Sequence, residues 1–260
     1  MEIHAHTHTP DPDPSTSSGH RGRKKWTHYL WEFLMLFLAV YCGFLAENLR
    51  EDNVEKHREK EIIVSLVEDL KKDTTLLNDQ LMIQKQNKIT MDSLVILLTA
   101  PDIKKGGAEL YYYSRKIFRF TFLRYTDRTI QQLKNAGSFR LIKSNKVADS
   151  ILKYYFHLDR ITDLQNQAQE RVIEFIISGR PVFDPLVFES MVNDQTENDI
   201  IKPLGNPLLL TYEKSRILNL ISIIHNLKSG NRVMQKNYID LKLQAAELIG
   251  FLKSEYHIKK

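Results

Sequence analysis

Residues 26–46 constrain the fold of this chain more than any other segment. They contain no Lys or Arg and one acidic residue, Glu32. At about 1.5 Å of rise per residue, a helix of this length reaches roughly 31 Å, enough to cross the hydrocarbon core of a bilayer. Trp26, Tyr29 and Trp31 gather at one end, as aromatic side chains do at a membrane interface. We therefore predict a transmembrane helix, with the lipid bilayer as its surroundings.

The flanking charges predict the orientation of this helix. A cluster of basic residues precedes it, and only Arg50 lies close to its other end. The positive-inside rule therefore places the N-terminus in the cytoplasm and the chain after residue 46 outside it. The alternatives are a cleaved signal peptide and a lipoprotein cut before Cys42, but the small residues that such cuts require are not in place. We expect an uncleaved signal anchor. The basic cluster consists of Arg21, Arg23, Lys24 and Lys25.

Two features inside the predicted anchor bear on function. Glu32 is costly in lipid, so it either reaches the headgroups or is protonated, or it serves a proton or partner site. Ala39, Gly43 and Ala46 fall on one helical face. Such a face lets a second helix approach closely, although three small residues also occur there by chance. We predict a homo-oligomer or a membrane-protein partner.

Residues 1–25 are polar and rich in His, Pro and Ser, so we expect a disordered cytoplasmic tail. His4, His6 and His8 alternate, and such a tract can hold a transition metal loosely. The alternative is a soluble tail with incidental histidines. We predict no cofactor.

Residues 47–260 are predicted to form an all-α extracytoplasmic domain, an antiparallel bundle of long helices. Most of the 10 Gly and 8 Pro of the 260 residues lie in the tail and a few clusters, and no Pro lies between Pro14 and Pro101. Apolar residues recur at helical spacing on long segments. We expect a helix through residue 98, then a helix to about residue 118 that is followed by an extended crossing. A short helix 127–136 capped by Thr126, a long helix from Ser144 to Ile177 and a short helix Leu186–Val192 come next. The final helix runs from Thr211 to Tyr256, with Leu218 on its buried stripe and a kink at Ser229-Gly230.

The most polar candidate site surrounds residues 119–140. Basic side chains there are interleaved with aromatic ones, a mixture that binds anionic ligands or partners. The alternative is an aromatic core segment with solvated arginines, with Asp127 and Asn135 in caps and turns. The mild net charge of +5 and the predicted location argue against nucleic acid. The candidate residues are Arg119, Arg124, Asp127, Arg128, Lys134 and Arg140.

Motifs that carry catalysis are absent from the sequence: it has no P-loop, no G-x-G-x-x-G, no G-x-S-x-G and no H-E-x-x-H. The one cysteine, Cys42, excludes an intrachain disulfide. We assign His57 to a solvated face, and His157 and His225 to partly buried positions. An enzyme is therefore the less favoured class, and no catalytic residue is named.

The phrase Thr129-Ile-Gln-Gln-Leu-Lys-Asn-Ala-Gly-Ser-Phe-Arg-Leu-Ile142, followed by Val147-Ala-Asp-Ser-Ile-Leu-Lys-Tyr-Tyr155, resembles an uncharacterised family of gram-negative bacterial single-pass membrane proteins. The anchor ending Phe44-Leu-Ala-Glu-Asn48 is similar as well. The resemblance implies an inner-membrane protein with a helical periplasmic domain of unknown function. It brings no activity and no catalytic residues.

Together these patterns favour a membrane-anchored helical interaction, sensory or scaffold module. Two alternatives stay open: an enzyme with an unrecognised site in the bundle, and an accessory subunit of a proton-coupled membrane complex that uses Glu32.

Overall fold

The computed structural model describes residues 23–135, 137–193 and 199–259, with side chains from residue 26 onward. These residues are helical apart from connecting segments and one isolated bridge between Val192 and Ile200. The all-α prediction is therefore confirmed. The chain forms two compact units, one that ends at Glu55 and one that begins at Lys56. Both units take part in helix α1 (Arg23–Leu98), the uninterrupted helix that the absence of Pro predicted.

The first unit is the N-terminal part of α1. Its side chains from Trp26 to Val54 are exposed within the described chain, including the large apolar ones. The apolar stretch is long enough to cross a membrane, and none of it is buried. Apolar surface on every face of a helix needs an apolar surrounding. The structure thus contains one candidate membrane span among its described helices.

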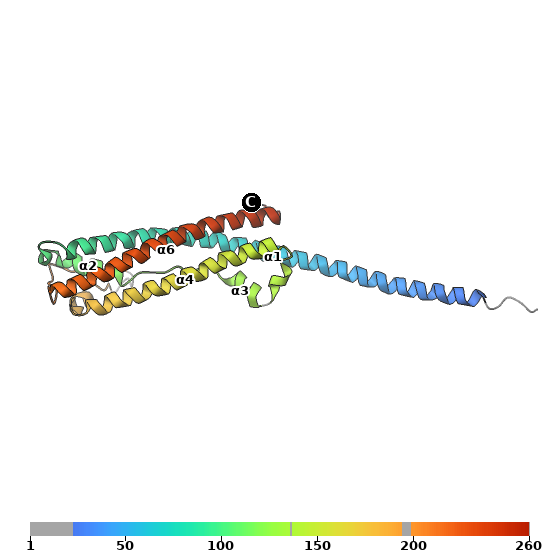
Figure 1. Cartoon of the computed structure of the whole chain (residues 1–260), viewed down its shortest axis with the longest axis horizontal. Coiled ribbons are helices and arrows are strands. Elements are labelled where there is room, and N and C mark those ends of the chain that lie inside the picture. Colours follow the sequence, from blue (N-terminus) through green and yellow to red (C-terminus); the bar gives the residue numbers. More distant parts are fainter. Residues whose placement is uncertain (1–22, 136, 194–198, 260) are drawn as a thin grey trace, which may run out of the picture. The chain divides into compact units, whose positions relative to one another are not determined.

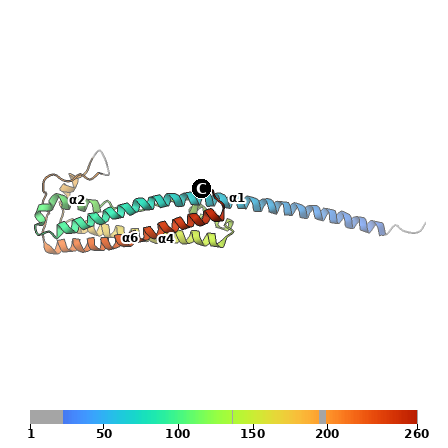
Figure 2. The ribbon, with the colours of Figure 1, turned by 90° about the horizontal axis from the view of Figure 1, so that it is seen from above.

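The second unit is a bundle of four elements that run alternately up and down (Figures 1 and 2). The first is α1 from Lys56. The second combines α2 (Gly107–Ile117) with an extended segment at 119–127. The third and fourth are α4 (Asn145–Gly179) and α6 (Lys214–Glu255). The predicted antiparallel order therefore holds between successive elements, with one element half helical and half extended.

Short elements connect these four. They are η1 (Ile103–Gly106), α3 (Arg128–Asn135), η2 (Ser138–Leu141) and α5 (Pro185–Glu189). Gly137 follows α3 with φ 61°, a left-handed conformation that glycine adopts without strain. Asp184 caps α5 by accepting from the backbone N–H of Leu186 at 2.9 Å.

Two hydrophobic clusters hold the bundle together. The first joins α1, α4 and α6 around Leu66, Tyr154 and Leu241. The second joins the other end of the same helices to α2 around Leu94, Tyr111, Phe175 and Leu220. Further aromatic side chains pack there as well, namely Phe118, Phe183 and Phe188. Rings there meet mostly edge to face; those of Tyr111 and Phe183 are 5.3 Å apart at 74°. Burial of this apolar surface is the main stabilising contribution.

Several details differ from the sequence predictions. Leu218 is exposed, because the buried stripe of α6 begins at Ile217 and Leu220. Helix α6 runs through Gly230 as one helix, and the kink expected at Ser229-Gly230 stays a prediction. Helix α5 is shorter than predicted and ends at Glu189. His225 is exposed rather than partly buried, whereas His157 is half-buried as expected.

We predict that Gly107→Ala destabilises the bundle. A Cβ at this position would lie 1.9 Å from the carbonyl oxygen of Pro207, so the loop backbone would have to move. The backbone N–H of Gly107 also donates to Asn206 Oδ1 at 2.8 Å. We expect the free energy of unfolding to fall by about 1–3 kcal/mol, the usual cost of overpacking. The measurement is urea denaturation of the full chain in detergent.

The matched control is Gly250→Ala in α6. No heavy atom lies within 4 Å of a Cβ there. Because alanine favours a helix over glycine by about 1 kcal/mol, this variant should be as stable as the parent or more so. Equal destabilisation by both substitutions would show that the approach of Gly107 to Pro207 is not the cause.

Candidate functional site

Three buried carboxylates on one side of α1 organise the connections of the bundle. We call Glu59, Asp69 and Asp73 the carboxylate row; they are 6%, 0% and 1% exposed. Carboxylates are rarely buried unless donors surround them. Each of the three accepts hydrogen bonds from a part of the chain outside α1.

Asp69 binds the start of α3. It accepts from the hydroxyl of Thr129, from the backbone N–H of Thr129 at 3.3 Å, and from Arg128 Nη2 at 3.4 Å. The first N–H groups of a helix have no partner within the helix and carry partial positive charge. Asp69 therefore caps α3 from a different helix, a role that the sequence analysis assigned to Thr126.

Asp73 binds the extended segment and α4. It accepts from the backbone N–H of Thr126 at 2.8 Å and from the Tyr154 hydroxyl at 3.0 Å. The Thr126 hydroxyl also donates to it, so this side chain faces α1 instead of capping α3. Burial raises the pKa of Asp73, its hydrogen bonds oppose that shift, and the charge of Asp69 adds to it. Burial and Asp73 raise the pKa values of Tyr154 and Tyr155 in turn.

Glu59 binds the segment before α4 and the end of α6. It accepts from the backbone N–H of Lys143 at 3.0 Å and from the Tyr256 hydroxyl at 2.6 Å. Both bonds join segments far from Glu59 in the sequence. The carboxylate row thus links α1 to the extended segment, to α3, to α4 and the residue before its cap, and to the end of α6.

A polar layer separates the two hydrophobic clusters. It contains Gln84 from α1, Gln165 from α4 and Asn231 from α6. Gln165 donates to the Tyr238 hydroxyl at 2.9 Å and to the carbonyl of Leu123 at 3.4 Å, and Asn231 donates to the carbonyl of Gln84 at 3.1 Å. An extended segment cannot satisfy its own backbone groups, so its neighbours supply the partners. The layer lies where the second element is extended.

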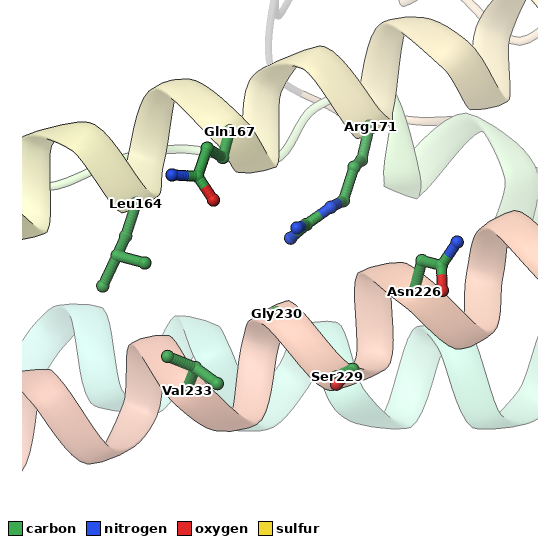
Figure 3. A pocket seen from close by; sticks show the side chains of 7 residues that line it. All are labelled: Leu164, Gln167, Arg171, Asn226, Ser229, Gly230 and Val233. Atoms are coloured by element: carbon green, nitrogen blue, oxygen red, sulfur yellow. The ribbon is translucent and has the colours of Figure 1, made fainter.

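A groove opens between α4 and α6 beside this layer (Figure 3). Its volume is about 430 Å³, within the range of small-ligand sites. Leu164 and Val233 supply apolar wall, and the polar lining is Gln167, Arg171, Asn226 and Ser229. Arg171 extends from α4 toward Gly230 of α6, where a Cβ would lie 2.7 Å from Nη1. Glycine thus permits the guanidinium to lie against the backbone of α6.

A smaller cavity of about 30 Å³ also borders Gly230. Its lining mixes Gln84, Asn87 and Asn231 with Phe120 and Phe122. The volume is enough for a water molecule, and the amides supply hydrogen-bonding partners for one.

The candidate residues of 119–140 differ in burial. Arg119 is half-buried, and Asp127 and Arg128 are exposed beside the start of α3. Arg128 pairs with Asp69 at 3.4 Å, which gives it a structural role. None of the candidates lines the groove between α4 and α6, and whether they bind a ligand or partner stays a prediction. The remaining candidates, Arg124, Lys134 and Arg140, have exposed side chains.

The candidates in the anchor are exposed as well. Ala39, Gly43 and Ala46 present a free face in the described chain, and no heavy atom lies within 4 Å of a Cβ at Gly43. Glu32 lies 3.3 Å from His28 Nε2, one helical turn away, a pairing that the sequence analysis did not use. The predicted metal ligands His4, His6 and His8 lie outside the described residues.

Sequence reasoning missed the carboxylate row and the groove. The i, i+4 spacing of Asp69 and Asp73 on an apolar stripe was the available signal for the first, because both positions belong to the buried face. Arg171 and Gly230 are 59 residues apart in the sequence and carried no shared signal.

Across the described residues, no group of three or more His, Cys, Asp or Glu side chains is arranged to hold a metal ion. The single cation that lines the groove is Arg171, and hydrogen-bonding groups surround it. This arrangement suits binding of a small molecule.

Comparison with protein-family models, with curated proteins and with solved structures finds no match. The resemblance carried by residues 129–155 therefore stays a prediction.

We predict that Asp73→Asn makes the protein less sensitive to rising pH. Because the folded pKa of Asp73 lies above its ordinary value of 3.8, its contribution to stability is largest below that value. The contribution is lost as pH rises through the folded pKa, by about 1.4 kcal/mol for each pH unit that separates the folded from the unfolded pKa. Asparagine can still accept from Thr126 and donate to Tyr154. The variant should gain stability relative to the parent as pH rises from the ordinary value of 3.8 through the folded pKa, measured by urea denaturation.

Asp92→Asn is the control with the opposite sign. Hydrogen bonds from Lys228 and Lys88 lower the pKa of Asp92. Its contribution is present above the unfolded pKa and is lost as pH falls through the folded one, so this variant should lose stability relative to the parent as pH rises. A parallel response of the two variants would contradict the assignment.

Proposed function

We propose that this protein is a membrane-anchored helical module for interaction or sensing, with its bundle outside the cytoplasm. One observation carries the proposal: a single helix, α1, supplies both the candidate membrane span and the buried carboxylate row of the bundle. A bundle attached in this way is confined to the membrane surface, where partners and ligands are met. The groove between α4 and α6 provides a place for a ligand.

The flanking charges support the proposed location. The basic residues before Trp26 favour a cytoplasmic N-terminus, and the family resemblance points to the inner membrane of a gram-negative bacterium. The bundle would then lie in the periplasm, and the chain would cross the membrane once.

Two surfaces support a protein partner or a second copy of the chain. The small-residue face of Ala39, Gly43 and Ala46 suits a packed helix within the membrane. On the bundle, Phe156 is 76% exposed and Leu152, one turn before it, is also exposed. Adjacent exposed apolar side chains are typical of interaction surfaces.

The alternative role in a proton-coupled complex gains one observation, the approach of Glu32 to His28 within the apolar part of α1. Two ionisable side chains one helical turn apart in a membrane segment are the kind of arrangement found in proton relays. Glu32→Gln should abolish proton-dependent activity in that case, and an unchanged phenotype would remove this alternative.

If the module acts by binding a protein partner, that partner should contact Phe156. A photo-crosslinking amino acid at this position in native membranes should give a discrete adduct of higher mass, identified by mass spectrometry. The control is the same amino acid at Asp163, an exposed position on the same helix, where no adduct is expected. If neither position gives an adduct, Phe156 is excluded as an interaction surface.

The orientation predicts which side of the membrane the bundle occupies. In a Cys42→Ser background, Gln169→Cys places the only thiol on the exposed face of α4. A membrane-impermeant maleimide should label it in intact spheroplasts. Labelling only after the membrane is opened would reverse the orientation.

A further inference from the structure

We infer that the groove between α4 and α6 binds a small organic anion, with a carboxylate of the ligand paired to Arg171. The inference names a ligand class for the sensing role and rests on the proposed function only for its biological use. The geometry of Figure 3 carries it.

The guanidinium of Arg171 is available to a ligand. It carries five N–H donors in a planar fork that matches a carboxylate. Within the described chain, neither a hydrogen bond nor an ion pair to another side chain occupies it. Nη1 of the guanidinium lies against Gly230, and the side chain of Arg171 extends into the space between α4 and α6 (Figure 3).

The surrounding side chains suit a ligand that also carries hydroxyl groups. Gln167 and Asn226 offer carboxamides and Ser229 a hydroxyl, which donate and accept alike. In the described chain these three side chains also have no hydrogen-bonding partner. Leu164 and Val233 close one end of the groove with apolar surface. Polar groups around a charged anchor beside apolar wall are typical of sites for small polar molecules.

The charge of the groove favours one negative charge on the ligand. Among the residues that the structure describes, Arg171 is the only basic one in the lining of the groove. Lys228, close by on α6, pairs instead with Asp92. A doubly charged phosphate group would leave one charge unmatched, whereas one carboxylate balances one guanidinium.

Binding can be measured with defined probes. Full-length protein in nanodiscs is titrated with D-glucuronate and D-gluconate, and saturation-transfer NMR reports the bound fraction. D-Glucose is the neutral counterpart, inorganic phosphate is the competing anion, and empty nanodiscs are the blank. We expect saturable binding of the carboxylates, and no binding of glucose or phosphate.

Variants assign the binding to the groove. Arg171→Gln should weaken carboxylate binding at least about tenfold, as expected for loss of a charge-assisted pair. Arg160→Gln removes a charge from an exposed position of α4 outside the groove and should leave affinity unchanged. Gly230→Ala suits a helix, but its Cβ displaces the guanidinium, so it should weaken binding while circular dichroism shows an intact fold.

Three results would overturn the inference: no binding of either carboxylate, equal binding by Arg171→Gln, or binding of phosphate in preference to carboxylates. Each of them leaves the crosslinking result at Phe156 as it stands, because that experiment does not depend on a ligand. The two proposals can therefore fail separately.

Discussion

Asp69 and Asp73 are buried in the middle of an apolar helix face, where an ionised side chain is costly unless donors surround it. The donors come from the return segment at 119–129, which leaves its helix after Ile117 and so gives up the internal hydrogen bonds of a helix. The carboxylates accept hydrogen bonds from backbone N–H groups of this segment that have no partner within a helix, and Arg128 adds a positive charge beside Asp69. Two helices are joined to α1 through these carboxylates: Asp69 caps the first turn of α3, and the Tyr154 hydroxyl of α4 donates to Asp73.

The same reasoning explains why the core is divided. Three long helices can bury a continuous apolar stripe, but the extended part of the second element brings polar backbone into the bundle. Gln165 accommodates the carbonyl of Leu123, and Asn231 bridges to the backbone of α1. The polar layer therefore divides the hydrophobic core into two separate clusters. It also places the groove between α4 and α6 at the level where side chains are polar and a glycine is tolerated.

Much of the fold could be predicted from sequence, because helical periodicity is a local property. The stripe of α4 from Val147 to Ile161 is buried as expected, and α2 ends at Ile117, close to the predicted residue 118. The prediction that Leu218 is buried was wrong, because the buried face of α6 begins with Ile217 and Leu220 and is therefore turned by one residue from the predicted face. The site could not be predicted, since Arg171 and Gly230 meet only when α4 and α6 pack together. Thr126 was assigned as a cap because a carboxylate on a distant helix cannot be seen in a local pattern.

The carboxylate row also sets the rotation of α1 about its own axis. Successive residues of a helix are turned by about 100°, so a slip of one residue would carry all three carboxylates away from their donors. The hydrogen bonds of Glu59, Asp69 and Asp73 therefore keep α1 in one register against its neighbours. A twist applied to α1 would have to turn the neighbouring segments with it or break several buried hydrogen bonds at once. The bundle is thus stiff toward torsion of the helix that also carries the candidate membrane span.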